Sequence, residues 1–327
     1  MAKSTNIEGE LAALEELRNA PLSAAVLAGL RRGLASRSNY VAARAAKLAG
    51  ERELEQMREE LEAAFTRFMA NPLKTDPGCR AKLAAAEALI KLGGFRPDVF
   101  LQGIHHVQLE PVFGGREDTA APLRALCAAG LVAAGYPGAL NELADLLADN
   151  EPDARLGAVR AVLQTGDSAG IPLLRLKTRL GDSDPRIVYE CFAALTAMDP
   201  EANLELVAHY LSHEHTETAE AAAFALGESR LPQAIPLLKS MWENSLDHDR
   251  RQAAFTALAM LRLESAIDYL IQLVAEESPA IASAAAQALA LFRDDERIWP
   301  RVQQLAAERG DIALDPARGY NANQRKL

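Results

Sequence analysis

The chain has 327 residues, of which 49% are hydrophobic but only 5% are aromatic, so alanine and aliphatic side chains make up most of the apolar set. Its 35 Lys and Arg residues face 45 Asp and Glu residues, and the net charge of −10 argues against general binding to a phosphate backbone. No stretch is apolar enough for a secretory signal or a membrane span, so we expect a soluble, cytoplasmic protein.

An alanine-leucine step recurs along the chain at a nearly fixed interval. It appears at Ala161-Val162, Ala194-Leu195, Ala225-Leu226, Ala257-Leu258 and Ala288-Leu289, with intervals of 33, 31, 32 and 31 residues. A period in this range is typical of stacked helical pairs. We therefore predict an all-α fold, an α-solenoid of about eight helical hairpin repeats over residues 1–309, in which each second helix ends on this step.

The first repeats, over residues 11–135, are irregular. Gly130-Leu131 keeps the 31-residue interval, but Ala88-Leu89 lies 42 residues earlier and Ala45-Ala46 another 43. Two repeats are thus about ten residues longer than the others. We interpret the extra residues of the earlier one as a longer first helix over 53–70, which ends before Pro72. The second gain, over 103–118, contains three Gly and one Pro and lacks a helical period, so we predict an inserted loop or short hairpin there.

Residues 136–294 contain the regular repeats. Leucines and isoleucines at steps of three and four predict first helices over 139–149, 171–180, 203–213, 235–244 and 266–276. Two of these carry the same IPLL segment, at 171–174 and 235–238, and Pro172 and Pro236 suit a first helical turn. Residues 297–309 predict a capping helix with a polar outer face, and residues 310–327 a loose tail.

The three cysteines, Cys79, Cys127 and Cys191, are far apart and show neither metal-type nor redox-type spacing. Cys127 and Cys191 lie four residues before the repeat leucine, where the other repeats have alanine. We therefore predict that both are small buried thiols in the core.

The second-helix segments RLGAVRAVLQTGD, ETAEAAAFALGES and AIASAAAQALALFRD resemble HEAT repeats, in particular those of the phycobilin-lyase-like HEAT family. The resemblance covers roughly residues 21–309. It implies the solenoid fold, and the family includes chaperone-like lyase subunits, assembly factors and plain interaction modules.

Positions counted from the repeat leucine also predict an exposed stripe on the second helices. The stripe is formed by the residues nine, six and two positions before that leucine. Arginine is concentrated in the first five repeats and acid in the next two, with apolar residues between, a combination typical of protein-binding surfaces. The alternative is that the tyrosines pack between repeats and the charges only solvate the face. The candidate partner-binding residues are Arg37, Tyr40, Arg44, Arg80, Leu156, Arg160, Arg186, Tyr189, Glu217, Glu220, Phe224 and Asp249.

The insert over 103–118 is a second candidate site, because insertions into a repeat array often carry function. Its candidate residues are His105, His106, Glu110 and Arg116. The alternative is a structural plug, in which Val107, Leu109, Val112 and Phe113 cover a repeat that lacks a full first helix.

Three enzymatic alternatives have less support. His209 and His213 have the spacing of metal ligands, but they lie at the end of a first helix, where histidines suit the helix dipole. Deoxyhypusine hydroxylase, a HEAT-type di-iron enzyme, has His-Glu pairs six residues before the step, and this chain has none there. A HEAT-like DNA glycosylase would need a basic face bearing tryptophan, whereas Trp242 and Trp299 fall on or near first-helix or cap positions.

We therefore expect a non-catalytic scaffold that binds a peptide or protein in its concave groove, with a phycobilin-lyase-like chaperone or assembly factor as the alternative. We expect no cofactor, no metal and no membrane partner, and nucleic acid is not an expected ligand.

Overall fold

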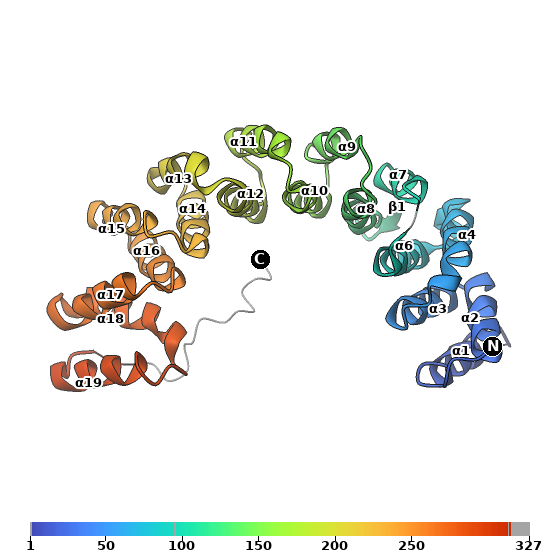
Figure 1. Ribbon diagram of the computed structural model, residues 1–327, viewed down its shortest axis with the longest axis horizontal. Coiled ribbons are helices and arrows are strands. Elements are labelled where there is room, and N and C mark those ends of the chain that lie inside the picture. The colour runs from blue at the N-terminus through green and yellow to red at the C-terminus, as the bar shows by residue number, and fades with distance from the viewer. Residues whose placement is uncertain (1, 95, 313, 315–327) are drawn as a thin grey trace. The chain divides into compact units, whose positions relative to one another are not determined.

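The computed structural model in Figure 1 describes residues 2–94, 96–312 and 314. The chain divides into two compact units, Met1–Thr165 and Gly166–Leu327, which we call unit 1 and unit 2. The arrangement of residues 1–309 as one solenoid stays a prediction.

Unit 1 begins with α1 (Ala2–Glu16) and continues as four pairs of helices. The pairs are α2 (Ala24–Ala35) with α3 (Asn39–Glu51), α4 (Arg58–Met69) with α6 (Arg80–Leu92), α7 (Asp98–Ile104) with α8 (Ala121–Ala133), and α9 (Ala139–Leu146) with α10 (Pro152–Thr165). Short elements fill the connections: η1 (Glu55–Met57), α5 (Pro72–Thr75), η2 (Pro77–Cys79) and the strands β1 (Leu109–Val112) and β2 (Gly115–Asp118).

Unit 2 repeats the pairing with shorter connections and ends on a cap. The pairs are α11 (Ile171–Leu180) with α12 (Pro185–Met198), α13 (Pro200–His209) with α14 (Thr216–Ser229), α15 (Ala234–Asn244) with α16 (His248–Met260), and α17 (Glu264–Glu276) with α18 (Pro279–Leu289). Three 3-10 turns, η3 (Ser168–Gly170), η4 (Tyr210–Ser212) and η5 (Ala290–Phe292), and the last helix α19 (Trp299–Arg309) complete it. The described residues thus form eight helical pairs, which confirms the predicted α-solenoid class.

The repeating alanine-leucine step lies in the core of both units. Five leucines of the step have no exposed surface: Leu89 and Leu131 in unit 1, and Leu195, Leu226 and Leu258 in unit 2. Small residues beside them let neighbouring second helices approach closely. A Cβ on Gly157 of α10 would lie 2.3 Å from the Cβ of Ala125 on α8, and one on Gly227 of α14 would lie 2.7 Å from the carbonyl oxygen of Ala257 on α16.

Acidic caps and prolines begin several helices of unit 2. The Asp184 side chain accepts a hydrogen bond from the backbone N–H of Arg186, and Asp199 does the same for Ala202. Each cap is followed at once by proline, whose missing N–H is not needed in the first turn. The sequence therefore fixes these starts locally.

Cys127 and Cys191 are fully buried, as predicted, and Cys79 is buried as well. Burial raises the pKa of the Cys79 thiol and of the Cys191 thiol to about 12, and it raises the pKa of Cys127 too. All three are therefore protonated thiols at neutral pH, with little nucleophilic character.

The interpretation of the first gained segment is wrong. Helix α4 has 12 residues and is not one continuous helix over 53–70. Glu53 has a positive φ of 51°, and the separate 3-10 turn η1 lies between Glu53 and the start of α4. The extra residues lie in the connection from α4 to α6, which holds α5 and η2. Its left-handed positions, Asn71, Gly78 and Cys79, turn the chain sharply at both ends of this segment.

The second gained segment is a short hairpin, in line with the prediction for 103–118. It follows α7, which has only seven residues, so this pair does lack a full first helix. At the other end of the chain the capping helix begins at Trp299 rather than 297. Of the predicted tail over 310–327, residues 313 and 315–327 lie outside the described residues.

Candidate functional site

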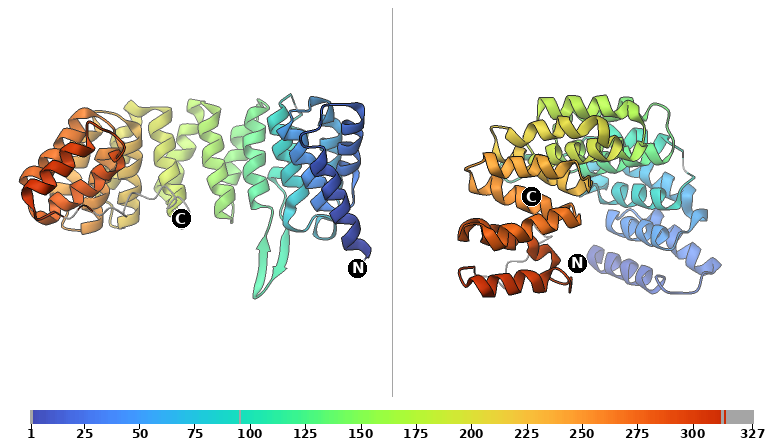
Figure 2. Two further views of the ribbon diagram at one scale, coloured as in Figure 1. Left: turned by 90° about the horizontal axis from the view of Figure 1, so that it is seen from below. Right: turned by 60° about the vertical axis from the view of Figure 1, so that its left-hand side comes forward.

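The most distinctive feature of unit 1 is the hairpin formed by β1 and β2. The strands are antiparallel, with Leu109 opposite Asp118 and Val112 opposite Gly115. Gly114, with a φ of +89°, makes the turn at the tip. Figure 2 shows that the hairpin extends beyond the ends of the helices around it in unit 1.

The apolar side chains of this segment point into solvent. Val107, Leu109 and Val112 are 57, 46 and 45% exposed, and Phe113 at the tip is fully exposed. The plug interpretation required these four residues to cover the core, so it is wrong as stated. The buried residues are polar ones at the base, Gln108 and Asp118, and they face the helices instead.

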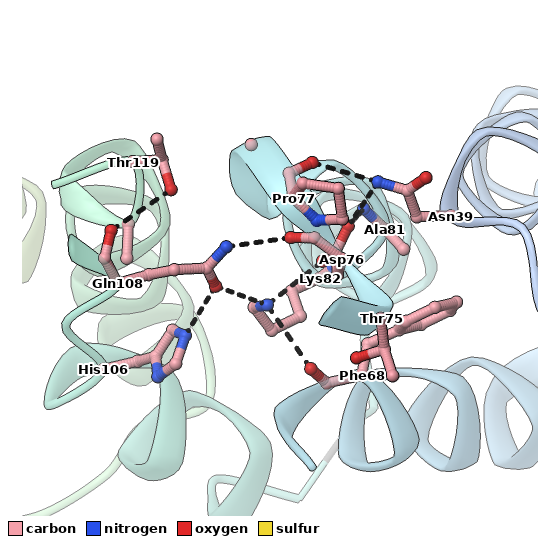
Figure 3. Close-up of polar contacts among 12 residues, drawn as sticks. Asn39, Phe68, Thr75, Asp76, Pro77, Ala81, Lys82, His106, Gln108 and Thr119 are labelled. Carbon is pink, nitrogen blue, oxygen red and sulfur yellow. Dashed lines mark hydrogen bonds and ion pairs between the residues drawn. The ribbon is translucent and has the colours of Figure 1, made fainter. Parts of the chain in front are cut away.

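The first part of the base is an ion pair with no solvent exposure. The Lys82 Nζ atom of α6 lies 3.1 Å from the Asp76 Oδ2 atom, and both side chains are completely buried. The same ammonium donates to the Gln108 Oε1 atom at 2.9 Å and to the Phe68 carbonyl oxygen at 3.4 Å (Figure 3). A buried ion pair needs such additional hydrogen bonds to offset its desolvation.

Asp76 is placed for this role by the connection between α4 and α6. Its carboxylate accepts hydrogen bonds from the backbone N–H groups of Ala81 and Lys82, at 2.9 and 3.1 Å, and from Asn39 Nδ2 at 3.1 Å. The Gln108 amide in turn donates to the Asp76 carbonyl oxygen at 2.8 Å (Figure 3). Asp76 thus joins α3 and α6 through its carboxylate and the start of the hairpin through its carbonyl oxygen.

The second part of the base centres on Asp118 at the end of β2. Its carboxylate accepts from the backbone N–H groups of Gln108 and Ala120, and the Arg124 guanidinium of α8 lies 2.7 Å away. Burial opposes ionisation, but these hydrogen bonds and the guanidinium outweigh it and lower the pKa of Asp118. Arg124 also holds the Asp149 carboxylate with two hydrogen bonds of 2.8 Å. The two strand ends are therefore tied to α8 and to the connection before α10.

The predicted insert residues divide into two groups. Glu110 and His106 belong to the base: Glu110 accepts from the backbone N–H of Gly78 and from Gln108, both at 2.6 Å, and His106 Nε2 lies 3.1 Å from Gln108 Oε1. Burial lowers the pKa of His106. His105 and Arg116 are exposed, and the His105 Nε2 atom lies 2.9 Å from the Glu142 carboxylate.

Four central base residues were missed by the sequence prediction: Asp76, Lys82, Gln108 and Arg124. One signal could have found two of them. Lys82 and Arg124 each lie seven residues before the repeat leucine, on a helix face that is otherwise apolar. A basic residue at such a position indicates a buried cation with partners elsewhere in the chain.

A cavity of about 270 Å³ lies beside the hairpin base in unit 1. Its lining includes Asp118, Glu117 of β2, and Glu151 and Asp153 at the start of α10. The wall therefore bears four carboxylates, and no Lys or Arg is part of it among the residues that the structure describes.

The predicted stripe is only partly exposed in unit 1. Arg37, Tyr40, Arg80 and Arg160 are exposed, and the Arg80 guanidinium lies 5.2 Å from the centre of the Tyr40 ring. Arg44 is half-buried and forms an ion pair with Glu15 of α1. Leu156 is buried, which contradicts its assignment to the exposed stripe, and the next residue, Gly157, approaches α8 closely.

In unit 2 the stripe combines exposed acids with half-buried side chains. Glu217 and Asp249 are exposed, whereas Tyr189, Glu220 and Phe224 are half-buried. Burial, together with the carboxylates of Asp249, Glu217 and Asp247, raises the pKa of Glu220. Arg186 does not present a free charge, since its guanidinium lies 2.6 Å from the Asp184 cap.

The residues of the enzymatic alternatives have packing contacts. Trp242 donates from Nε1 to the Tyr269 hydroxyl at 2.7 Å and packs against Phe255, and Trp299 lies against Arg293. His209 and His213 flank the Tyr210 ring. Within the described ranges, no three His, Cys, Asp or Glu side chains gather in a group that could hold a metal ion.

Among the helices that the structure describes, none combines the length and the apolar character needed to cross a membrane.

Comparison with known proteins gives one family match. Residues 175–259, which run from α11 to α16, match the model of HEAT repeats. No curated protein matches the sequence.

Three solved structures resemble the chain at low similarity. The complex of CpcE and CpcF of phycocyanin lyase from Nostoc sp. PCC7120 has 17% identity and a TM-score of 0.36, over 89% of this chain and 96% of that one. An engineered protein has 16% identity and a TM-score of 0.37, over 92% and 94%. Human deoxyhypusine hydroxylase in complex with glycerol has 19% identity and a TM-score of 0.32, over 80% and 98%.

The family match and the paired helices agree with each other. The matched segment spans the first three helical pairs of unit 2, and the pairs outside it have the same two-helix arrangement. The family match therefore identifies HEAT repeats at residues 175–259, which is less than half of the chain.

Proposed function

We propose that this chain is a non-catalytic protein-binding scaffold and that hairpin β1–β2 of unit 1 is its main contact. One observation carries the proposal: the apolar residues of the hairpin are exposed, while its base is fixed by buried polar groups. A hairpin that served only to close the core would bury its apolar residues and expose its polar ones.

The construction of the hairpin suits binding for an energetic reason. Exposed apolar side chains gain free energy when a partner covers them, at roughly 25 cal/mol for each Å² removed from water. A rigid base lowers the entropy lost when the tip is fixed in a complex. Phe113 is the natural anchor, because aromatic residues that fill a pocket dominate many protein interfaces.

The surroundings of the hairpin indicate the chemistry of the partner. The cavity beside its base is lined by Glu117, Glu151 and Asp153, so a basic group fits there. We therefore infer a protein partner that offers an apolar pocket to Phe113 and a Lys or Arg side chain to this cavity.

The exposed residues of the second helices provide a further contact within the same proposal. Arg37 and Arg80, with the Tyr40 ring beside Arg80, present positive charge in unit 1, whereas Glu217 and Asp249 present negative charge in unit 2. The basic residues of unit 1 would bind the acidic part of a peptide or protein segment.

The experiment compares the proteins captured by four forms of the full chain. The forms are the wild type, V112S/F113S at the hairpin tip, R37E/R80E at the stripe, and L246S as a control that removes an exposed leucine in unit 2. Captured proteins are measured by quantitative mass spectrometry, and the affinity of each candidate is then measured with the purified partner.

We expect V112S/F113S to lose at least one partner by tenfold or more, while L246S keeps it. The tip variant should unfold at the same denaturant concentration as the wild type, because the changed side chains make no core contacts. Equal capture by the tip variant and the wild type would contradict the hairpin as the main contact. Equal capture by R37E/R80E would contradict only the stripe.

The role of a phycobilin-lyase-like chaperone or assembly factor stays a prediction of the sequence resemblance. Incubation with a bilin and an acceptor phycobiliprotein tests it. Covalent adduct formation or a spectral shift would support the role, and the absence of both would count against it.

A further inference from the structure

A cleft in unit 2, separate from the hairpin and from the stripe, gathers basic and aromatic side chains. It has a volume of about 610 Å³ and lies between α11 and the segment formed by α13 and η4. Arg175 and Arg179 form one wall, and His209, Tyr210 and His213 form the other, with Glu205 as the acid of the lining.

The two arginines lack counter-ions in the part of the chain that the structure describes. Arg175 and Arg179 are four residues apart on α11 and share the face that lines the cleft. Neither forms an ion pair or hydrogen bond with a described residue, although unit 2 has 24 Asp and Glu against 16 Lys and Arg. Lys177, between them in the sequence, lies 2.8 Å from the Asp182 carboxylate.

Two like charges at this spacing destabilise a helix, so the pair is not explained by the stability of α11. Arg179 is in the last turn, where a cation favours the helix dipole, but Arg175 is one turn earlier and gains little from it. A missing anion is the simplest partner for both guanidinium groups.

The opposite wall is held in place and offers further hydrogen-bond donors. The Tyr210 ring lies 4.9 Å from the Phe192 ring, centre to centre, and its hydroxyl donates to the Thr178 carbonyl oxygen at 3.5 Å. The His213 Nδ1 atom accepts the backbone N–H of His215 at 3.2 Å. In the neutral ring the proton of His213 is therefore on Nε2, which leaves this nitrogen as a donor.

We propose that this cleft binds a small organic oxyanion, a molecule that carries a phosphate or carboxylate group beside an apolar or aromatic part. Guanidinium groups pair with the oxygens of both anions in a forked geometry. The cleft volume falls within the range of small-molecule sites and exceeds what one phosphate fills. Leu206, Ala202 and the Tyr210 ring line the space left for the rest of the ligand.

The experiment uses isothermal titration of the full chain with three probes at constant ionic strength. Inorganic phosphate tests the anion alone, phenyl phosphate adds a ring, and citrate tests carboxylate in place of phosphate. The proteins are the wild type, R175Q/R179Q, and the control R297Q/R301Q. The control removes two arginines at the same spacing from unit 2, but these lie 3.5 and 3.2 Å from Asp295 and Asp268.

We expect the wild type to bind phenyl phosphate or citrate at one site per chain, and phenyl phosphate more tightly than phosphate. R175Q/R179Q should lose at least tenfold in affinity, while R297Q/R301Q should bind as the wild type does. The relative affinities of phenyl phosphate and citrate identify the anion. Absence of binding with all three probes, or equal affinity of R175Q/R179Q and the wild type, would overturn the proposal. The proposal is independent of the hairpin, so R175Q/R179Q should still capture every hairpin partner.

Discussion

Units 1 and 2 differ at one position of their second helices, seven residues before the last residue of the repeating step. In unit 1 this position is always polar, and the four side chains are buried; in unit 2 it is mostly apolar. The residues are Asn39, Lys82, Arg124 and Arg155 in unit 1, and Val188, Ala219, Arg251 and Ala282 in unit 2.

The difference accounts for the two long connections of unit 1, which lie before α6 and before α8. A buried cation needs acceptors close by, and the connection before each helix supplies them. Lys82 forms an ion pair with Asp76, and Arg124 forms ion pairs with Asp118 and Asp149. Arg155 donates to the carbonyl oxygens of Asp149 and Asn150. In unit 2 the alanines need no such partner, so short connections suffice. The polar position therefore fixes the place from which the hairpin projects.

Replacing Lys82 by Met is expected to give the largest effect. The variant leaves the Asp76 carboxylate buried without its cation, which should lower the free energy of unfolding of unit 1 by about 3–5 kcal/mol. Hydrogen exchange measured by mass spectrometry should show faster exchange in α6 and the hairpin, with unit 2 unchanged. Lys47→Met, at an exposed position of the same unit, is the control and should change stability by less than about 0.5 kcal/mol. Equal stability of the two variants would remove the buried pair as a structural requirement.

Changing Gly157 or Gly227 to alanine tests what the units share. Each added Cβ would meet a neighbouring helix, at 2.3 Å from Ala125 Cβ and at 2.7 Å from the Ala257 oxygen. We expect both variants to lose about 1–3 kcal/mol in denaturant unfolding because the helices must move apart. Gly9→Ala on α1, with no atom within 4 Å of the added carbon, should not destabilise the protein. A loss confined to one unit would show that the second helices of the two units are packed differently.

Replacing Glu220 by Gln should give the smallest effect and one of opposite sign. Because the folded state raises the pKa of Glu220 above its ordinary 4.5, ionisation opposes folding. The wild type is therefore free of this penalty below pH 4.5 and acquires it as the pH rises through the raised pKa. The Gln variant should be more stable at pH 7 by about 0.5 kcal/mol, the scale of a like-charge pair on a helix, and equally stable at pH 4. Glu205→Gln, at an exposed position of α13, is the control. A stability gain that is the same at both pH values would rule out ionisation as its cause.

The repeat pattern predicted the fold and the core well because both depend on local periodicity. The positions counted from the repeat leucine correctly predicted that Leu89, Leu195 and Cys191 are buried. The first helix over 171–180 has the predicted bounds. The exposed stripe was predicted less well. Leu156 is covered and Arg186 is held by its own helix cap, because exposure also depends on how closely the next helix approaches.

The repeat pattern predicted the helical pairs, their approximate number and the small buried residues between them, because an alanine-leucine step at this period can bury its face only against a neighbouring pair. The tertiary structure alone decided that the 103–118 insert exposes its apolar residues and that Lys82 is buried against Asp76. It also decided that Arg175 and Arg179 face the ring of Tyr210 across a cleft. These features join residues from different helices and connections, and no local periodicity records which of them meet.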